Sequence, residues 1–406
     1  MQWVRESLGE ICRKGRGRIQ TGPFGSQLHE SDYSPEGIPV VMPADIAEGK
    51  IAVTRIARVP ERHVDRLKRH KLSKGDIVYG RRGDIGRQAL VRDENIGWLC
   101  GTGCLKISLG DGPLTYEFLH RYLSTTAVVG WIEGQAVGAT MPNLNTGILE
   151  RVPVFYPEDT ETQDKIVAIL SAYDELIENN QRRIALLEKM AEEIYREWLV
   201  RLRFLGHEKV KKVKGVPDGW SDQKFGQFCQ LQRGFDLTDA DVESGPYPVI
   251  ASTSIKAYHS QYKVEPPVIT TGRSGSLGEV LFVNTRAWPH NTALYVKKFF
   301  GNSAFLVYYT LKNMRLENFN AGAGVPTLNR NHLNGIPIIV PSKEIQIQFD
   351  GVVSILHAQA ELLRNANQKL TMTRDSLLPR LISGKLPVEN LDIQFPPSME
   401  EPVHET

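Results

Sequence analysis

Cysteine is scarce in this chain, whose 406 residues contain only Cys12, Cys100, Cys104 and Cys229. Cys100 and Cys104 form one close pair, but no second pair and no nearby histidine completes a standard zinc-binding pattern. We interpret them as small buried residues and predict no metal site. So low a count gives no disulfide framework and suits a reducing cytosol.

Long apolar runs and a strong net charge are also missing. No run approaches the ~20 residues that a membrane-spanning helix needs. The formal net charge is only +2, so the chain is not a general polycation. Any surface that binds nucleic acid must therefore be local.

Recognisable catalytic motifs are absent as well. His207 and Glu208 do not begin an H-E-x-x-H zinc motif, and no Asn/Asp-Pro-Pro-Tyr/Phe methyltransferase motif occurs. Asp218, Asp222 and Lys224 imitate a nuclease motif only loosely. We therefore predict a recognition protein without catalytic residues. The rival hypotheses are a metal-dependent nuclease and a protein-interaction scaffold without DNA specificity.

What the chain does contain is an internal repeat. Residues 138–157 read GATMPNLNTGILERVPVFYP, and residues 322–341 read GAGVPTLNRNHLNGIPIIVP. Six positions of the first copy meet the same residue about 184 positions later, as Pro142 meets Pro326. A repeat of this length indicates two homologous units rather than a solenoid.

The pattern along the chain predicts an α+β protein with two mixed α/β domains and two long helices. Short β-like runs broken by Gly, Pro, Asp and Ser alternate with uninterrupted, charge-rich stretches of helical period. We expect the following segments: domain 1 at 1–157, a long helix at 158–205, a hinge and domain 2 at 206–340, a long helix at 341–387, and a disordered tail at 388–406.

Each of the two long helices is expected to need a partner helix. A helix of some 45 residues spans roughly 65 Å, which one small domain cannot cover. Apolar residues recur in a coiled-coil-like pattern, and Asn180 would fix the register at some cost in stability. The predicted pairing residues are Ile166, Tyr173, Asn180, Leu187, Ile194, Phe349, Leu356, Leu363, Leu370 and Leu377.

Residues 16–27, which read RGRIQTGPFGSQ, form the first candidate binding segment. Glycines allow close approach of a backbone, and the polar side chains suit phosphates and base edges. The alternative is a basic turn with Phe24 buried. The candidates are Arg16, Arg18, Thr21, Gly22, Phe24, Gly25, Ser26 and Gln27, with Arg233 in the matching segment of domain 2.

Residues 80–87, which read GRRGDIGR, form the second candidate, and residues 272–278 match them as GRSGSLG. Glycines explain a hairpin, but a turn does not need arginines, which bind phosphate and guanine. No Gly-Lys-Ser/Thr follows, so this is no nucleotide-binding P-loop. The candidates are Arg81, Arg82, Arg87, Arg273, Ser274 and Ser276.

The repeated Pro-x-Leu-Asn segment is the third candidate, with Asn143, Asn145, Asn329 and Arg330. An asparagine amide can hydrogen-bond adenine or a phosphate oxygen. It can equally bond its own backbone in a turn, and the sequence leaves both interpretations open.

Together these motifs resemble the specificity subunits of type I restriction-modification systems. The resemblance covers essentially the whole chain. It rests on the order and duplication of TGPFGS at 21–26, GRRGDIG at 80–86, the two P-x-L-N ends, YREWL at 195–199 and RDSLLPRLISGK at 374–385. Domain 2 departs from the pattern, having Arg-Gly-Phe-Asp at 233–236 in place of GPFGS.

The resemblance implies a division of labour. Two target recognition domains each bind one half of a split double-stranded DNA site, and the helices pair antiparallel as spacer and docking site. It also implies two methyltransferase subunits and restriction motor-nuclease subunits as partners, in a prokaryotic cytoplasm. S-adenosylmethionine, ATP and Mg are expected on those partners, so this chain would carry no cofactor and no catalysis.

Overall fold

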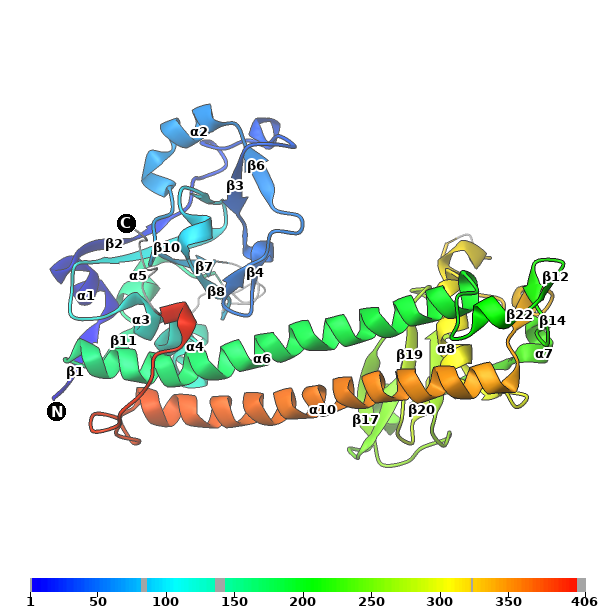
Figure 1. The fold of residues 1–406 in the computed structure, drawn as a ribbon. Coiled ribbons are helices and arrows are strands. Elements are labelled where there is room, and N and C mark those ends of the chain that lie inside the picture. The colour runs from blue at the N-terminus through cyan, green and yellow to red at the C-terminus, as the bar shows by residue number, and fades with distance from the viewer. Residues whose placement is uncertain (1, 82–85, 136–142, 323, 400–406) are drawn as a thin grey trace. The chain divides into compact units, whose positions relative to one another are not determined.

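The computed structural model describes residues 2–81, 86–135, 143–322 and 324–399 (Figure 1). The chain forms two compact units. Unit 1 comprises Met1–Asn179 and Ala366–Thr406, and unit 2 comprises Asn180–Asn365. Each long helix contributes one part to each unit.

Unit 1 is built around a four-stranded antiparallel sheet. The strand order is β2 (Arg16–Thr21), β10 (Cys104–Gly110), β7 (Ile77–Gly80) and β8 (Gln88–Leu90). Smaller sheets join β6 (Ala57–Val59), β3 (Ile38–Val41) and β9 (Leu99–Cys100); β1 (Trp3–Ser7) and β11 (Pro153–Pro157); and β4 (Ile46–Ala47) and β5 (Lys50–Ile51). The helices are α1 (Leu8–Lys14), α2 (Glu61–Arg66), α3 (Tyr116–Leu123), α4 (Thr126–Gln135) and α5 (Thr146–Glu150).

Unit 2 repeats this plan except for the two-stranded hairpins: β4–β5 of unit 1 follows β3, whereas the hairpin of unit 2 precedes its first repeated strand. Its four-stranded sheet has the order β15 (Gln230–Arg233), β21 (Ala293–Lys298), β18 (Val268–Gly272) and β19 (Val280–Val283). Smaller sheets join β17 (Ile255–His259), β16 (Tyr247–Ile250) and β20 (Trp288–Pro289); β14 (Ser221–Lys224) and β22 (Pro337–Val340); and β12 (Lys212–Val213) and β13 (Val216–Pro217). The helices are α7 (Phe225–Phe228), α8 (Ala304–Asn313) and α9 (Arg330–Leu333). The predicted duplication is therefore confirmed in three dimensions.

Short helical turns fill the connections. They are η1 (Glu30–Asp32), η2 (Pro43–Asp45), η3 (Lys68–His70), η4 (Asp93–Asn95), η6 (His207–Lys209), η7 (Asp239–Asp241), η8 (Leu316–Phe319) and η9 (Pro397–Met399).

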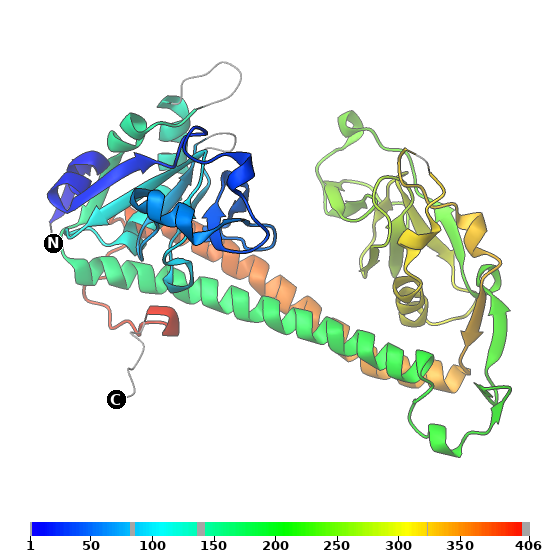
Figure 2. The same cartoon turned by 90° about the horizontal axis from the view of Figure 1, so that it is seen from above.

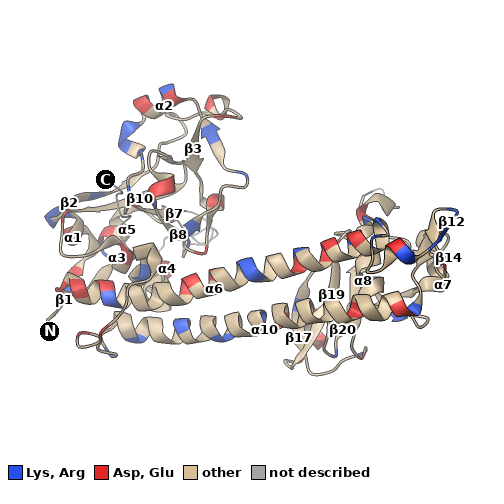
Figure 3. Ribbon diagram, viewed as in Figure 1, with Lys and Arg blue, Asp and Glu red and all other residues tan. Residues whose placement is uncertain are grey.

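The two long helices are α6 (Thr160–Tyr195) and α10 (Lys343–Ile382), which run side by side in both views (Figures 1 and 2). A π-helical turn, Arg196–Val200, extends α6. Pro379 lies inside α10, near its end. Charged residues of both signs are spread along the helices (Figure 3).

Cross-helix contacts within each unit confirm that α6 and α10 are antiparallel. In unit 1, Asp174 pairs with Arg374 (Oδ1–Nη1 2.5 Å), and the Asn367 amide donates to the Ile177 carbonyl oxygen at 3.1 Å. In unit 2, Arg364 pairs with Glu188. As the residue number rises along α6, that of its partner on α10 falls.

None of the ten predicted pairing residues is exposed. Ile166 and Phe349 are buried among the core residues of units 1 and 2, and Asn180 is 4% exposed. The others are half-buried: Tyr173, Leu187, Ile194, Leu356, Leu363, Leu370 and Leu377. Two paired helices cover each other on one side only, which leaves such positions incompletely shielded.

The tail corrects one prediction. Residues 388–399, which composition predicts to be disordered, pack on unit 1: Val388 is 1% exposed in its core, and Ile393 and Met399 contact that core. Three apolar side chains outweigh the acidic and proline-rich composition. The rest of the predicted tail, residues 400–406, lies outside the described residues.

All four cysteines are buried and unpaired. Burial raises the pKa of Cys12, Cys100 and Cys229 to about 12, so these thiols stay protonated. Among the described residues, no three metal-binding side chains gather into a site, and no helix has the length and apolar character to cross a bilayer.

Candidate nucleic-acid interface

Four segments meet at one edge of the unit 1 sheet, which we call loop edge 1 (residues 21–27, 81, 101–103 and 143–145). The Gly22 N–H donates to the Cys104 carbonyl oxygen at 2.9 Å, continuing the β2–β10 ladder. The Thr102 hydroxyl donates to the Pro23 carbonyl oxygen at 3.0 Å. The end of β2 and the start of β10 are thus tied together.

Gly22 has a structural role at this edge. A Cβ added there would lie 2.0 Å from the carbonyl oxygen of Gly101. Any other residue would push the two loops apart, so we assign Gly22 to backbone packing rather than to a direct contact.

Phe24 protrudes from loop edge 1 and is 53% exposed, so it is not buried in the turn. The loop beneath it is well bonded: the Phe24 carbonyl oxygen accepts from the Gln27 N–H at 2.8 Å and the Leu28 N–H at 3.2 Å. The Gln27 side chain accepts from the Phe24 N–H at 3.1 Å. Gly25 and Ser26 form the exposed tip.

Arg81 joins the end of β7 to this edge. Its N–H donates to the Gly103 carbonyl oxygen at 2.9 Å, and its Nε donates to Asn143 Oδ1 and the Leu144 carbonyl oxygen, each at 3.2 Å. The candidates Arg81 and Asn143 are therefore in direct contact. Arg82 lies outside the described residues.

Arg87 is exposed directly before β8, where its carbonyl oxygen accepts from the Gly80 N–H at 2.9 Å. Arg16 and Arg18 are not brought to loop edge 1. They pair with Gly110 and Ser108 at the opposite end of β2 from Thr21, roughly 16 Å away for Arg16 at the usual rise of a strand.

The two repeated asparagines cap helices. The side-chain oxygen of Asn145 accepts from the Ile148 N–H at 2.9 Å at the start of α5. That of Asn329 accepts from the Asn331 N–H at 3.1 Å at the start of α9. Of the two open interpretations, the local backbone bond therefore accounts for both carbonyl oxygens.

Unit 2 forms the matching loop edge 2 (residues 233–237, 273–276, 290–292 and 326–330). The Gly234 N–H donates to the Ala293 carbonyl oxygen at 3.0 Å, and the Arg273 N–H donates to the Thr292 carbonyl oxygen at 2.8 Å. The Arg273 guanidinium donates to the Asn291 carbonyl oxygen at 3.1 Å.

The remaining unit 2 candidates surround this edge. The Ser274 N–H donates to the Thr292 carbonyl oxygen at 3.2 Å, and the Ser274 carbonyl oxygen accepts from the Ser252 hydroxyl at 2.6 Å. Ser276 is exposed in the hairpin. The guanidinium of Arg330 donates to the Leu231 carbonyl oxygen at 3.3 Å.

These backbone bonds align the two edges residue by residue. The bond from Gly22 to Cys104 corresponds to that from Gly234 to Ala293, so Thr21 matches Arg233 and Phe24 matches Asp236. The Leu144 N–H donates to the Arg81 carbonyl oxygen at 2.9 Å, as the Leu328 N–H does to that of Arg273 at 2.8 Å. The sequence alignment of residues 232–235 with the first segment is thus supported by hydrogen bonding.

Sequence reasoning missed Asp236 and Asn291. Asp236 Oδ1 accepts from the Asn291 amide at 2.5 Å and from the Arg233 guanidinium at 2.7 Å. The hydrogen bond from Asn291 and the charge of Arg233 lower the pKa of the Asp236 carboxyl, which stays ionised at neutral pH. The only available signal was the position of Asp236 directly after the Arg-Gly-Phe segment.

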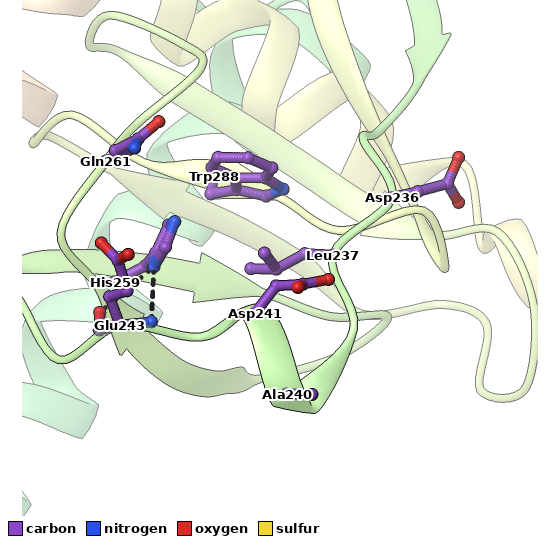
Figure 4. Close-up of a pocket in the computed structure, with 8 residues that line it drawn as sticks. All are labelled: Asp236, Leu237, Ala240, Asp241, Glu243, His259, Gln261 and Trp288. Atoms are coloured by element: carbon purple, nitrogen blue, oxygen red, sulfur yellow. Dashed lines mark hydrogen bonds between the residues drawn. The ribbon is translucent and has the colours of Figure 1, made fainter.

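A cavity of about 450 Å³ lies beside Asp236 (Figure 4). Trp288, His259 and the loop of residues 236–243 line it, and the Glu243 N–H is bonded to the His259 ring at 3.1 Å. Trp288 is 6% exposed and its indole N–H has no partner among the described residues. Asp241 and Glu243 give the cavity an acidic lining, which suits hydrogen-bond donors and disfavours phosphate, whereas the Asp236 carboxylate points away from the other lining residues (Figure 4).

Comparison with known proteins identifies the family to which this chain belongs. The model of the family described as type I restriction modification DNA specificity domain matches residues 2–189 and 217–372. The chain belongs to this family. The two matched segments correspond to its two repeats, each a domain followed by most of a long helix.

Two relatives in this family match most of the length of the chain. The type I restriction enzyme MjaIX specificity subunit of Methanocaldococcus jannaschii is 24% identical over 394 residues, with 89% of each chain covered. The HindI specificity subunit of Haemophilus influenzae is 21% identical over 478 residues, covering 95% of this chain and 99% of that protein.

A solved structure shows the same fold. The crystal structure of the type I restriction-modification S subunit from M. genitalium has a TM-score of 0.57 at 18% identity, covering 94% of this chain and 96% of that one. As a member of the type I specificity family, the chain is a DNA-recognition subunit that acts in a complex with DNA and other subunits.

Proposed function

We propose that the chain recognises a bipartite double-stranded DNA site, with unit 1 binding one half-site and unit 2 the other. The observation that carries the proposal is the duplicated loop edge. In both units the same backbone bonds hold an arginine, Arg81 or Arg273, at the end of an equivalent strand. A duplicated scaffold with different exposed side chains suits two half-sites of different sequence.

The two arginines have the chemistry for DNA. Arginine is the residue best suited to bidentate guanine and phosphate contacts, and Arg81 and Arg273 are both held by loop carbonyl groups. Preorganised side chains lose less conformational entropy on binding, which favours a sequence-specific interface over a loose electrostatic one.

The paired helices would act as spacer and docking site for two methyltransferase subunits, with a motor-nuclease subunit joining the complex. In support, several large apolar side chains on the helices face solvent. On α10 these are Ile347 (71% exposed), Ile355 (59%) and Leu362 (69%); on α6 they include Leu186 (60%) and Met190 (53%). Rows of exposed apolar residues mark surfaces that bind another protein.

The chemistry would belong to the partners. S-adenosylmethionine would bind the methyltransferase subunits, and ATP and Mg the motor-nuclease. This chain would then supply recognition without catalysis of its own.

Substitution of one arginine at a time tests the division into half-sites. The complex of full-length chain and methyltransferase subunits is footprinted on its target. Arg81→Ala is expected to weaken protection of one half-site, and Arg273→Ala protection of the other. The affinity for the affected half-site should fall about 5- to 150-fold in each case, since one good base contact contributes about 1–3 kcal/mol.

Each variant is the matched control of the other, and Arg13→Ala, an exposed arginine on α1, controls for loss of charge alone. Equal loss at both half-sites from either substitution would contradict the proposal. A wild-type complex without salt-dependent DNA affinity would instead favour a protein-interaction scaffold.

A further inference from the structure

Phe24 of unit 1 and Asp236 of unit 2 occupy the same position on the duplicated scaffold. Each follows by two residues the glycine, Gly22 or Gly234, whose N–H extends the ladder to the strand that pairs with β2 or β15. Both side chains face solvent, with Phe24 53% exposed and the Asp236 side chain 67% exposed.

Both side chains also stand on fixed supports. Phe24 is carried by a turn closed by bonds to Gln27 and Leu28, and Asp236 is bonded to Arg233 and Asn291. A side chain carried by a hydrogen-bonded backbone has less conformational freedom to lose when it meets a ligand. Packing does not require an exposed phenyl ring at one edge and an exposed carboxylate at the other.

Their chemistries differ in a way that matters for DNA. A phenyl ring has no hydrogen bond to offer a phosphate, but it makes good apolar contact with the thymine methyl group. A carboxylate is repelled by phosphate, but it accepts a hydrogen bond from the amino group that cytosine or adenine displays in the major groove. The acidic cavity next to Asp236 also favours groups that donate hydrogen bonds.

We infer that this shared position is a base-contacting, specificity-determining position in each domain. Phe24 contacts the methyl group of a thymine in the half-site of unit 1. Asp236 accepts a hydrogen bond from the exocyclic amino group of a base in the half-site of unit 2. The inference rests on the proposed bipartite recognition and adds the residues that make the two half-sites differ.

The test is selection of bound duplexes from a randomised pool by the full-length chain in complex with its methyltransferase subunits. In Phe24→Ala, preference for thymine at one position of the first half-site is expected to fall about tenfold, with the second half-site unchanged. In Asp236→Asn, preference for an amino-bearing base is expected to fall similarly at one position of the second half-site only. Oligonucleotides with cytosine or adenine at that position identify which base supplies the amino group.

Two control variants separate contact from folding. Phe395→Ala removes another exposed ring of unit 1, and Asp222→Asn removes an exposed carboxylate of β14 in unit 2; neither is expected to change base preference. Asn291→Ala removes one support of Asp236 but keeps the carboxylate, so the preferred base should stay the same. Thermal melting of each variant confirms that it is folded.

Three outcomes would overturn the inference. If the wild-type complex selects a bipartite site and both variants select it unchanged, the inference fails while the proposed function stands. If Asp236→Asn weakens all sequences equally, Asp236 merely anchors Arg233. If the wild-type complex selects no bipartite site, the proposed function fails as well.

Discussion

Gln163 offers a direct test of how each domain is fixed to its long helix. Its side chain is fully buried near the start of α6. Its Oε1 accepts from the Thr115 N–H at 2.8 Å, at the N-cap of α3. Its Nε2 donates to the carbonyl oxygens of Pro113 at 2.6 Å and Pro157 at 2.8 Å. One amide therefore joins the long helix, a short helix and the strand β11.

Gln346 makes the same connection in unit 2. Its Oε1 accepts from the N–H of Ser303, the N-cap of α8, at 3.0 Å. Its Nε2 donates to the Pro341 carbonyl oxygen at 3.0 Å and to the Asn302 side chain at 3.3 Å. The junction between domain and helix is thus duplicated along with the domains.

Gln163→Leu keeps the volume but removes all three bonds. The Pro157 carbonyl is left buried and the Thr115 N–H is left poorly solvated, each at about 1–3 kcal/mol. Apolar burial of the leucine offsets part of this, so we expect a net loss of about 2–3 kcal/mol. Gln346→Leu should cost somewhat less, because one of its three bonds, to the Asn302 side chain, is long at 3.3 Å.

Hydrogen exchange read by mass spectrometry resolves the two units, whose unfolding need not be a single transition. Gln163→Leu is expected to speed exchange in residues 113–123 by about 30- to 150-fold, which corresponds to about 2–3 kcal/mol. Exchange rates in peptides of unit 2 should not change. Gln346→Leu should instead speed exchange in unit 2 and leave unit 1 unchanged. Gln181→Leu, on an exposed part of α6, is the control. If Gln163→Leu speeds exchange no more than Gln181→Leu, the reasoning is refuted.

Three further predictions concern the helices. Burial lowers the pKa of His357 from 6.5 to about 4, so its contribution to stability is complete above pH 6.5 and falls toward pH 4, by at most about 1.4 kcal/mol per pH unit. His357→Gln should therefore make the melting temperature depend less on pH between pH 6.5 and pH 4. An unchanged pH dependence in the variant would contradict the assignment. Inserting seven residues into each helix, after Glu178 and after Asn365, should lengthen the preferred DNA gap between the two half-sites by about 10 Å, or three base pairs. Selection of the original gap would show that the helices do not set the distance between the half-sites. Leu362→Lys should reduce co-purification of methyltransferase subunits, whereas Leu391→Lys should not; equal recovery would show that Leu362 lies outside the docking site.

The repeated Pro-x-Leu-Asn segment was enough to predict the duplication, because its role is fixed by the backbone. Asn145 and Asn329 cap helices that precede the last strand of each domain. A cap residue has few chemical alternatives, so both copies keep it. The long helices could also be predicted from the sequence, because their pairing requires apolar residues at regular intervals.

Loop edges 1 and 2 were harder to predict, because loops bring their residues together. Arg16 and Phe24 are close in sequence, yet strand β2 carries them to opposite ends of the sheet. Arg81 and Asn143 are far apart in sequence but in contact. Asp236 resembled an ordinary loop carboxylate until the backbone bonds of Gly22 and Gly234 showed that it occupies the position of Phe24 in the duplicated plan.

The central claim is that two equivalent edges bind two separate DNA segments. Methylation mapping of random-sequence DNA by the complete complex tests it most directly. We expect two short specified segments separated by a gap of fixed length and arbitrary sequence. A single uninterrupted motif, or modification without regard to sequence, would contradict it.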